Sequence, residues 1–168
     1  MNWKTIVSNT MSKELSNELV SFFVEQPSVI IELLACIEKS DGKAADRSAW
    51  VLTHIWDKHP HLIQPHLSKI IGMLGLNISE AIQRSIIRIL QNSDLPEKHH
   101  GFLVDYCFRK IIDPKQAIAV RAFSIPVLHR LTKCYPELNS EFKLCLEELI
   151  PNASSGLKNR AKKYLSKV

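Results

Sequence analysis

The sequence predicts an all-α fold: an α-α superhelix, or solenoid, in which pairs of helices stack side by side. Three observations lead to this prediction. Turn residues divide the 168 residues into segments of helical length, apolar side chains in those segments recur every three or four positions, and an Arg followed by a small residue returns at a nearly constant interval. Because one pair of helices cannot bury its apolar side alone, such pairs have to stack on their neighbours.

Nine helices are expected between breaks made of proline, glycine and Asx residues, which favour turns. In chain order, the breaks lie at Gln26-Pro27, Asp41-Gly42, His59-Pro60, Gly75-Leu76-Asn77, Ser93-Asp94-Leu95-Pro96, Asp113-Pro114, Tyr135-Pro136 and Pro151-Asn152. The helices between them span 11–25, 27–39, 43–58, 61–75, 78–92, 97–112, 115–133, 137–149 and 154–167. Pro65 is expected to mark a late helix start or a kink, and Pro126 a bend, because proline has no N–H to donate.

The whole chain, residues 1–168, is expected to be one domain. Helix 11–25 serves as an N-terminal cap within residues 1–26, and the other helices form pairs in 27–59, 60–95, 96–135 and 136–168. The apolar spacing predicts which sides of these helices are buried. In 78–92 the predicted core residues are Ile78, Ala81, Ile82, Ile86, Ile89 and Leu90. In the last helix they are Leu157, Ala161, Tyr164, Leu165 and Val168.

The recurring Arg belongs to the second helix of each pair. The pairs of residues are Arg47-Ser48, Arg84-Ser85, Arg121-Ala122 and Arg160-Ala161, spaced by 37, 37 and 39 residues. An Asx residue lies six to eight positions before each Arg, at Asp41, Asn77, Asp113 and Asn152. The small residue lets neighbouring helices approach, and the guanidinium group is expected to satisfy carbonyls and side chains where two repeats meet.

These segments resemble HEAT-type repeats. "DPKQAIAVRAFSIPVLHRL", residues 113–131, is similar to the second helix of such a repeat, and "PHLIQPHLSKIIGML", residues 60–74, to the first. The resemblance covers residues 27–168. It implies a ladder in which a turn Asp and a helical Arg are hydrogen-bonded between adjacent repeats: Asp41 with Arg47, Asn77 with Arg84, Asp113 with Arg121, and Asn152 with Arg160. Asn77 and Asn152 depart from the family's Asp and cannot supply a charge.

The resemblance also implies a concave surface lined by the second helices, where a protein partner would bind. Polar residues late in those helices are the predicted contacts: His54, Lys58, Arg88, Gln91, His129 and Lys133. On the same helix as His54, Trp50 and Trp56 are both expected to pack in the core. Partial exposure of Trp56 at a recognition surface, where Trp is enriched, is the alternative. The predicted function is therefore a non-enzymatic binding module, with the partner and the oligomeric state left open.

The positive charge of the protein lies at its C-terminal end. The formal net charge is +5, and residues 1–157 hold 17 basic and 17 acidic groups. The excess comes from Lys158, Arg160, Lys162, Lys163 and Lys167. A capping repeat needs such a polar outer side for solubility. Contact with nucleic acid is the alternative, and some HEAT-like proteins are alkylpurine DNA glycosylases, although aromatic and basic residues do not alternate along this sequence.

No catalytic motif, cofactor motif or complete metal motif is found. Four histidines, His54, His59, His61 and His66, lie within thirteen residues, but their spacings of five, two and five differ from the i, i+4 pairs of zinc helices, so metal binding there stays open. Cys36, Cys107, Cys134 and Cys145 form no close pair and are expected to be reduced thiols. Without a long apolar run or a signal peptide, the protein is expected to be cytoplasmic.

Overall fold

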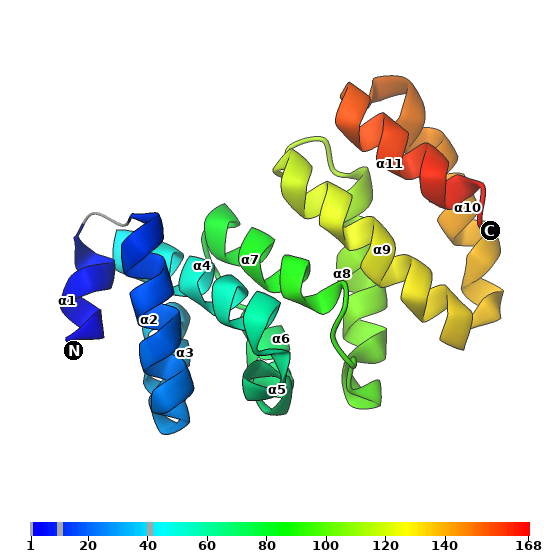
Figure 1. Cartoon of the computed structure of the whole chain (residues 1–168). Helices are drawn as coiled ribbons and strands as arrows, with labels where there is room; N and C mark the ends of the chain where they lie inside the picture. The colour runs from blue at the N-terminus through cyan, green and yellow to red at the C-terminus, as the bar shows by residue number, and fades with distance from the viewer. Residues whose placement is uncertain (1, 10–11, 40–41) are drawn as a thin grey trace. The chain divides into compact units, whose positions relative to one another are not determined.

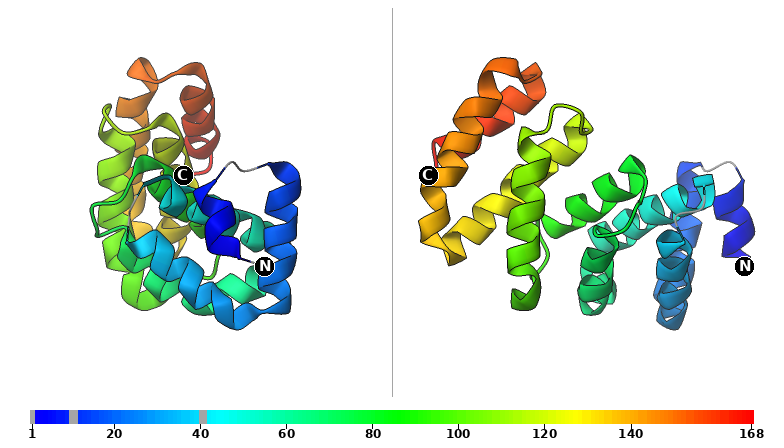
Figure 2. Two further views of the ribbon diagram at one scale, coloured as in Figure 1. Left: turned by 90° about the vertical axis from the view of Figure 1, so that its left-hand side faces the viewer. Right: turned by 180° about the vertical axis from the view of Figure 1, so that it is seen from behind.

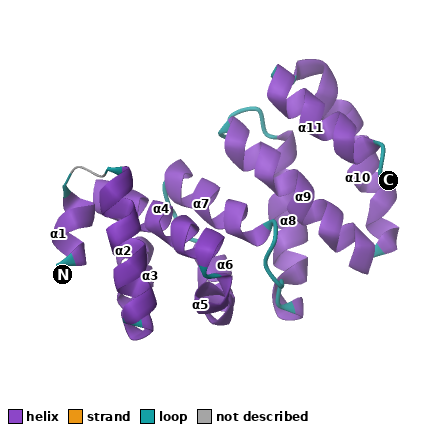
Figure 3. Ribbon diagram, viewed as in Figure 1, coloured by secondary structure: helices purple, strands orange, loops and turns teal. Residues whose placement is uncertain are grey.

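The computed structural model describes residues 2–9, 12–39 and 42–168. All regular structure in these ranges is helical (Figure 3), and the all-α fold class is confirmed. The chain divides into two compact units, residues 1–94 and 95–168. The division falls beside the predicted boundary between the second and third helical pairs.

The first unit is arranged around one long helix, α4 (Gly42–Lys58), which contacts α1, α2, α3, α5 and α7. Its other helices are α1 (Trp3–Ser8), α2 (Lys13–Glu25), α3 (Ile30–Glu38), α5 (Pro60–Ile63), α6 (Leu67–Met73) and α7 (Glu80–Leu90). Figure 1 shows α7 lying beside α4, and the two are the second helices of successive pairs. Apolar residues three or four apart in each helix supply the core, among them Phe23, Leu34, Leu52, Ile70 and Ile86.

The second unit repeats this arrangement with two pairs of helices (Figure 2). They are α8 (His100–Ile112) with α9 (Ile118–Cys134) and α10 (Asn139–Leu149) with α11 (Ser155–Leu165). The second helices α9 and α11 contact each other, and so do the first helices α8 and α10. Leu157 and Ala161 are buried as expected. Val168 is exposed, because α11 ends at Leu165 and the chain leaves the helical register.

Proline determines how the first helices begin. Pro27, Pro60 and Pro136 occupy the first position of a helical turn, where the missing N–H leaves no hydrogen bond unmade. Pro65 lies in a 3-10 turn, Gln64–His66, that separates α5 from α6, so the predicted helix 61–75 is two helices. The helix α9 continues through Pro126. The short helix α1 was not predicted, so residues 1–26 contain two helices rather than one.

The prediction that Trp50 is buried is wrong, whereas the prediction that Trp56 packs in the core is confirmed. Trp50 is 37% exposed, whereas Trp56 is 8% exposed and belongs to the core. Trp56 shares a helical side with the buried residues Thr53, Leu52 and Ala49, which lie three, four and seven positions earlier. In the described residues, no single helix is long and apolar enough to cross a membrane; Glu14–Glu25 and Pro27–Glu38 meet that requirement only together, across a 109° bend.

Candidate binding surface

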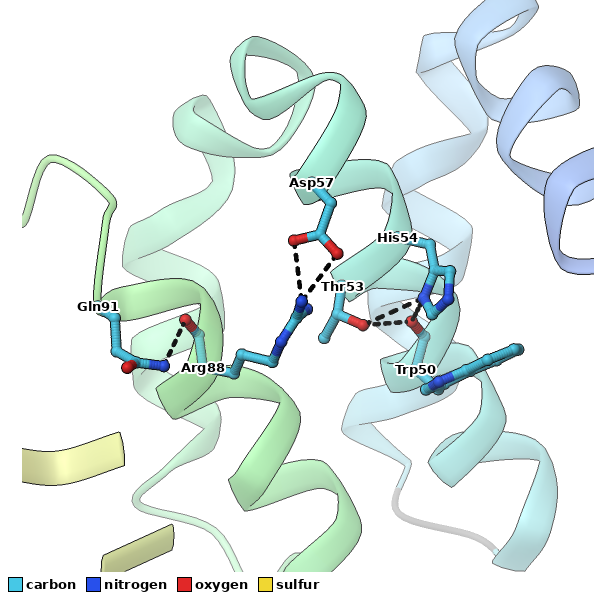
Figure 4. Close-up of polar contacts among 6 residues, drawn as sticks. All are labelled: Trp50, Thr53, His54, Asp57, Arg88 and Gln91. Atoms are coloured by element: carbon cyan, nitrogen blue, oxygen red, sulfur yellow. Dashed lines mark hydrogen bonds and ion pairs between the residues drawn. The ribbon is translucent and has the colours of Figure 1, made fainter. Parts of the chain in front are cut away.

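Trp50 is held in a defined position on the surface of α4. Its carbonyl oxygen accepts hydrogen bonds from Thr53 Oγ1 at 2.7 Å and from His54 Nδ1 at 3.0 Å (Figure 4). The second bond requires the proton of the neutral imidazole on Nδ1, because a carbonyl oxygen can only accept. The indole and imidazole ring centres lie 4.2 Å apart. An exposed indole is therefore packed against a histidine whose own orientation is set by the backbone.

The same side of α4 continues onto α7 through an ion pair. Arg88 Nη2 lies 2.8 Å from Asp57 Oδ2 and 3.1 Å from Asp57 Oδ1 (Figure 4). Gln91 Nε2 donates to the carbonyl oxygen of Arg88 at 3.2 Å. Because both charged side chains are about two-fifths exposed, the pair adds at most about 1 kcal/mol of stability. Its main effect is to hold Arg88 and Asp57 in one orientation.

These contacts define a surface on the first unit, which we call the Trp50 surface: Trp50, His54, Asp57, Arg88 and Gln91. Trp50, His54 and Asp57 are spaced i, i+4 and i+7, and Arg88 and Gln91 are spaced i and i+3, so each set shares one side of its helix. Three predicted contact residues, His54, Arg88 and Gln91, thus lie on one surface. Lys58 points elsewhere, with its Nζ 2.9 Å from Asn17 Oδ1 of α2.

The two predicted contact residues of the second unit differ from each other. Lys133 is exposed. His129 is 8% exposed, and its ring lies edge-on to Tyr164 and Phe142, with centre distances of 5.1 and 6.2 Å. Burial lowers the pKa of His129, and the positive charges of Lys133 and Lys167 lower it further. His129 is therefore a neutral core residue at neutral pH and is not available to a partner.

Three of the four recurring arginines, Arg47, Arg121 and Arg160, donate to backbone carbonyls. Arg47 Nη1 lies 3.1 Å from the oxygen of Val7, in the last turn of α1, and Arg121 Nε lies 3.0 Å from the oxygen of Ile111, in the last turn of α8. Carbonyls in the last turn of a helix have no partner within it, so each guanidinium satisfies an otherwise unpaired acceptor. Arg160 Nη1 donates to the oxygen of Ala122 at 3.2 Å.

The turn residues of the predicted ladder are placed as follows. Asp113 accepts from the backbone N–H of Lys115 at 2.9 Å and from Gln116 Nε2 at 3.0 Å, and these bonds lower its pKa. Arg84 is exposed, and in the described part of the chain no hydrogen bond joins it to Asn77. Asn152 is also exposed, and Asp41 lies outside the described residues.

The acceptor of Arg160 is explained by Pro126. A helical carbonyl normally accepts from the N–H four residues later, and for Ala122 that residue is Pro126, which has none. The guanidinium of Arg160, from the neighbouring second helix, supplies the missing donor. Pro126, which the sequence predicts to bend its helix, and Arg160, which it predicts to belong to the ladder, therefore take part in one contact.

A cavity of about 580 Å³ lies next to the Trp50 surface, at the corner between α4 and α5. It is lined by Trp56, Asp57, Pro60, His61, Gln64, Asn92 and Asp94. The amide of Gln64 is already occupied, since it bonds both the N–H and the carbonyl of Asp94, at 3.1 and 2.8 Å. Within the described ranges, no three His, Cys, Asp or Glu side chains are placed to hold a metal ion.

The cysteines show no sign of nucleophilic activation. Burial raises the pKa of Cys107 and of Cys145 to about 12, so both are protonated thiols at neutral pH. All four cysteines are free. Cys36 accepts a hydrogen bond from Ser48 Oγ at 3.4 Å, which gives it a packing role between α3 and α4.

Paired helices with an exposed polar and aromatic surface define a helical-repeat protein. A model of the HEAT repeat domain matches residues 3–168, so the chain belongs to the HEAT repeat family. The match extends the resemblance seen in residues 27–168 to the N-terminal helices. A comparison with curated proteins found no match, and a comparison with solved structures found none either.

Trp50 is the residue of this surface that is expected in the core from the sequence. The helical spacing contained a better signal, because Trp50, His54 and Asp57 fall on one side and two of these three residues are polar. A tryptophan aligned with polar residues at i+4 and i+7 indicates an exposed position.

Proposed function

We propose that the protein is a non-enzymatic binding module whose first unit presents the Trp50 surface to a protein partner. The exposed indole of Trp50, fixed by His54, is the observation on which this proposal depends. Membership of the HEAT repeat family supports it, since such helical repeats act as scaffolds for other proteins. The free and partly buried cysteines favour a reducing compartment such as the cytoplasm.

The chemistry of the surface suits a protein better than a small molecule. Tryptophan and arginine dominate the binding energy of protein interfaces, where a central aromatic residue is surrounded by polar groups that exclude water. Trp50 and Arg88 are both prepared for this role. We expect neither to lose much conformational freedom on binding, because the indole packs against the ring of His54 and the guanidinium is paired with Asp57.

The test is affinity capture of partners from the native host by wild-type protein and by Trp50→Ala, with quantitative mass spectrometry as the measurement. A residue at the centre of an interface costs about 2 kcal/mol or more when truncated, so we expect the affinity of the captured partner to fall about thirtyfold or more. Arg88→Ala is expected to weaken binding less, because its charge lies nearer the rim.

Leu144→Ala is the control, since Leu144 is also an exposed apolar residue but lies on α10, outside the Trp50 surface. It should leave capture unchanged. If a stable partner bound wild type and Trp50→Ala equally, the assignment of this surface would be wrong.

A further inference from the structure

The second helices of the second unit carry positive charge without any acidic residue. Residues 114–134 and 153–168, which contain α9 and α11, hold no Asp or Glu. They hold nine basic residues: Lys115, Arg121, Arg130, Lys133, Lys158, Arg160, Lys162, Lys163 and Lys167. The seven acidic residues of this unit all lie between 97 and 113 or between 137 and 148, on or beside the first helices. Since α9 and α11 contact each other (Figure 1), all the charged side chains of this layer are basic.

Several of these basic residues follow the line where α9 meets α11. Arg160 and Lys163 are spaced i and i+3 and therefore share one side of α11, and Lys167 lies in the turn that follows this helix. Arg160 marks the α9 side, because it donates to Ala122 of that helix. At the other end of the line, Lys133 follows His129 by one turn of α9, and the ring of His129 lies 5.1 Å from that of Tyr164, the residue whose ring Lys167 contacts. We call Lys133, Arg160, Lys163 and Lys167 the basic seam.

Two half-buried aromatic rings lie along the basic seam. The guanidinium of Arg160 lies 5.5 Å from the centre of Phe123, and the ammonium of Lys167 lies 4.9 Å from the centre of Tyr164. The sequence separates Phe123 from Arg160 by 37 residues, so only packing of α9 against α11 brings them together. Two basic side chains of the seam therefore lie against aromatic rings, although basic and aromatic residues do not alternate along the chain.

We infer that the second unit binds the phosphate backbone of nucleic acid along the basic seam, without regard to base sequence. From Arg160 to Lys167, the end of α11 and the turn that follows it extend about 10 Å, at roughly 1.5 Å per residue. One strand of a duplex carries a phosphate about every 3.4 Å along its axis, so the seam matches roughly three phosphates. This site lies in the second unit and is independent of the Trp50 surface.

The charges favour nucleic acid over an acidic protein segment. Lysine is depleted from the centres of protein interfaces, which depend on apolar anchors, whereas a row of lysines is typical of contacts to phosphates. Lys133, Lys163 and Lys167 are exposed, and none of them pairs with a carboxylate in the described part of the chain. Their mutual repulsion would be relieved by a polyanion.

The test is fluorescence anisotropy with a labelled DNA duplex of about 20 base pairs and with its single strand, titrated at NaCl concentrations from about 20 to 300 mM. We compare wild type with Lys133→Gln/Lys163→Gln/Lys167→Gln. Each lysine that contacts a phosphate adds about 1 to the slope of log K against log salt. The slope of the triple variant should therefore be smaller by about three, and its affinity at low salt should fall at least tenfold.

The control is Lys43→Gln/Lys98→Gln/Lys143→Gln, which removes three exposed lysines outside the basic seam. Its net charge equals that of the seam variant. It should keep most of the affinity and the wild-type slope. Circular dichroism and thermal melting establish that both triple variants fold. Absence of binding by either probe at the lowest salt would overturn the inference. So would equal losses in the two variants, or displacement of DNA by polyglutamate at equal charge concentration.

Discussion

At the scale of single residues, the recurring arginines act on backbone carbonyls that lack a partner. Arg47 and Arg121 reach the last turns of α1 and α8, and Arg160 reaches a carbonyl deprived of its donor by Pro126. An unpaired buried carbonyl costs about 1–3 kcal/mol, so these contacts matter more than the ion pairs on the surface. The sequence predicted the positions of these arginines but not their acceptors, because an acceptor is determined by the neighbouring helix.

Removing the guanidinium of Arg160 should leave the carbonyl oxygen of Ala122 without a hydrogen-bond donor. We expect Arg160→Met to lower the free energy of unfolding by about 1.5–3 kcal/mol, the range for hydrogen bonds made by charged groups. In a Pro126→Ala background, the new N–H at position 126 can bond Ala122 within α9, so the same substitution should cost at least about 1 kcal/mol less. Urea unfolding of the four proteins in this cycle measures the coupling.

Equal costs of Arg160→Met in both backgrounds would show that Arg160 contributes through its other contacts, such as the ring of Phe123, and not through the carbonyl.

At the scale of helices, local sequence signals determined most boundaries. Ser79 precedes α7, and its Oγ accepts a hydrogen bond from the N–H of Ile82 at 3.2 Å. The same hydroxyl donates to Asp46 of α4, so one residue both starts α7 and joins it to the preceding second helix. The short helix α1 escaped prediction because six residues show too little periodicity for a pattern to be recognised.

The two serines that precede α7 and α11 provide a matched comparison. Ser79→Ala should lower the free energy of unfolding by about 1 kcal/mol, the usual cost of losing a helix N-cap. Ser154 precedes α11 without a capping side-chain bond, so Ser154→Ala should cost less than about 0.5 kcal/mol. Chemical denaturation measures both, and equal costs would mean that the hydroxyl of Ser79 has no special role.

At the scale of the whole molecule, the charge is divided unequally between the two units. Residues 1–94 hold 9 basic and 10 acidic groups, whereas residues 95–168 hold 13 basic and 7 acidic groups. A net charge of +6 on the smaller unit opposes its compact state through repulsion, and salt screens that repulsion. The first unit has a net charge of −1, so charge repulsion does not oppose its compact state in this way.

Salt should therefore stabilise the two units differently. Raising NaCl from about 20 to 300 mM shortens the Debye length several-fold, and we expect amide hydrogen exchange in α11 to slow by a factor on the order of three. Exchange in α3 of the first unit should change little. Measuring both helices in one sample provides the internal control, and equal changes in the two would contradict a local charge effect.

The sequence by itself determined that the protein is all-α, built from paired helices, and punctuated by proline and a recurring Arg. These properties depend on periodicity and turn chemistry within about twenty residues of chain, which a sequence displays directly. Only the tertiary structure decided that Trp50 is exposed, that His129 is buried beneath Tyr164, and that Arg160 serves a carbonyl freed by Pro126. Such contacts join residues up to 40 positions apart, and they depend on how helices pack and not on any local preference.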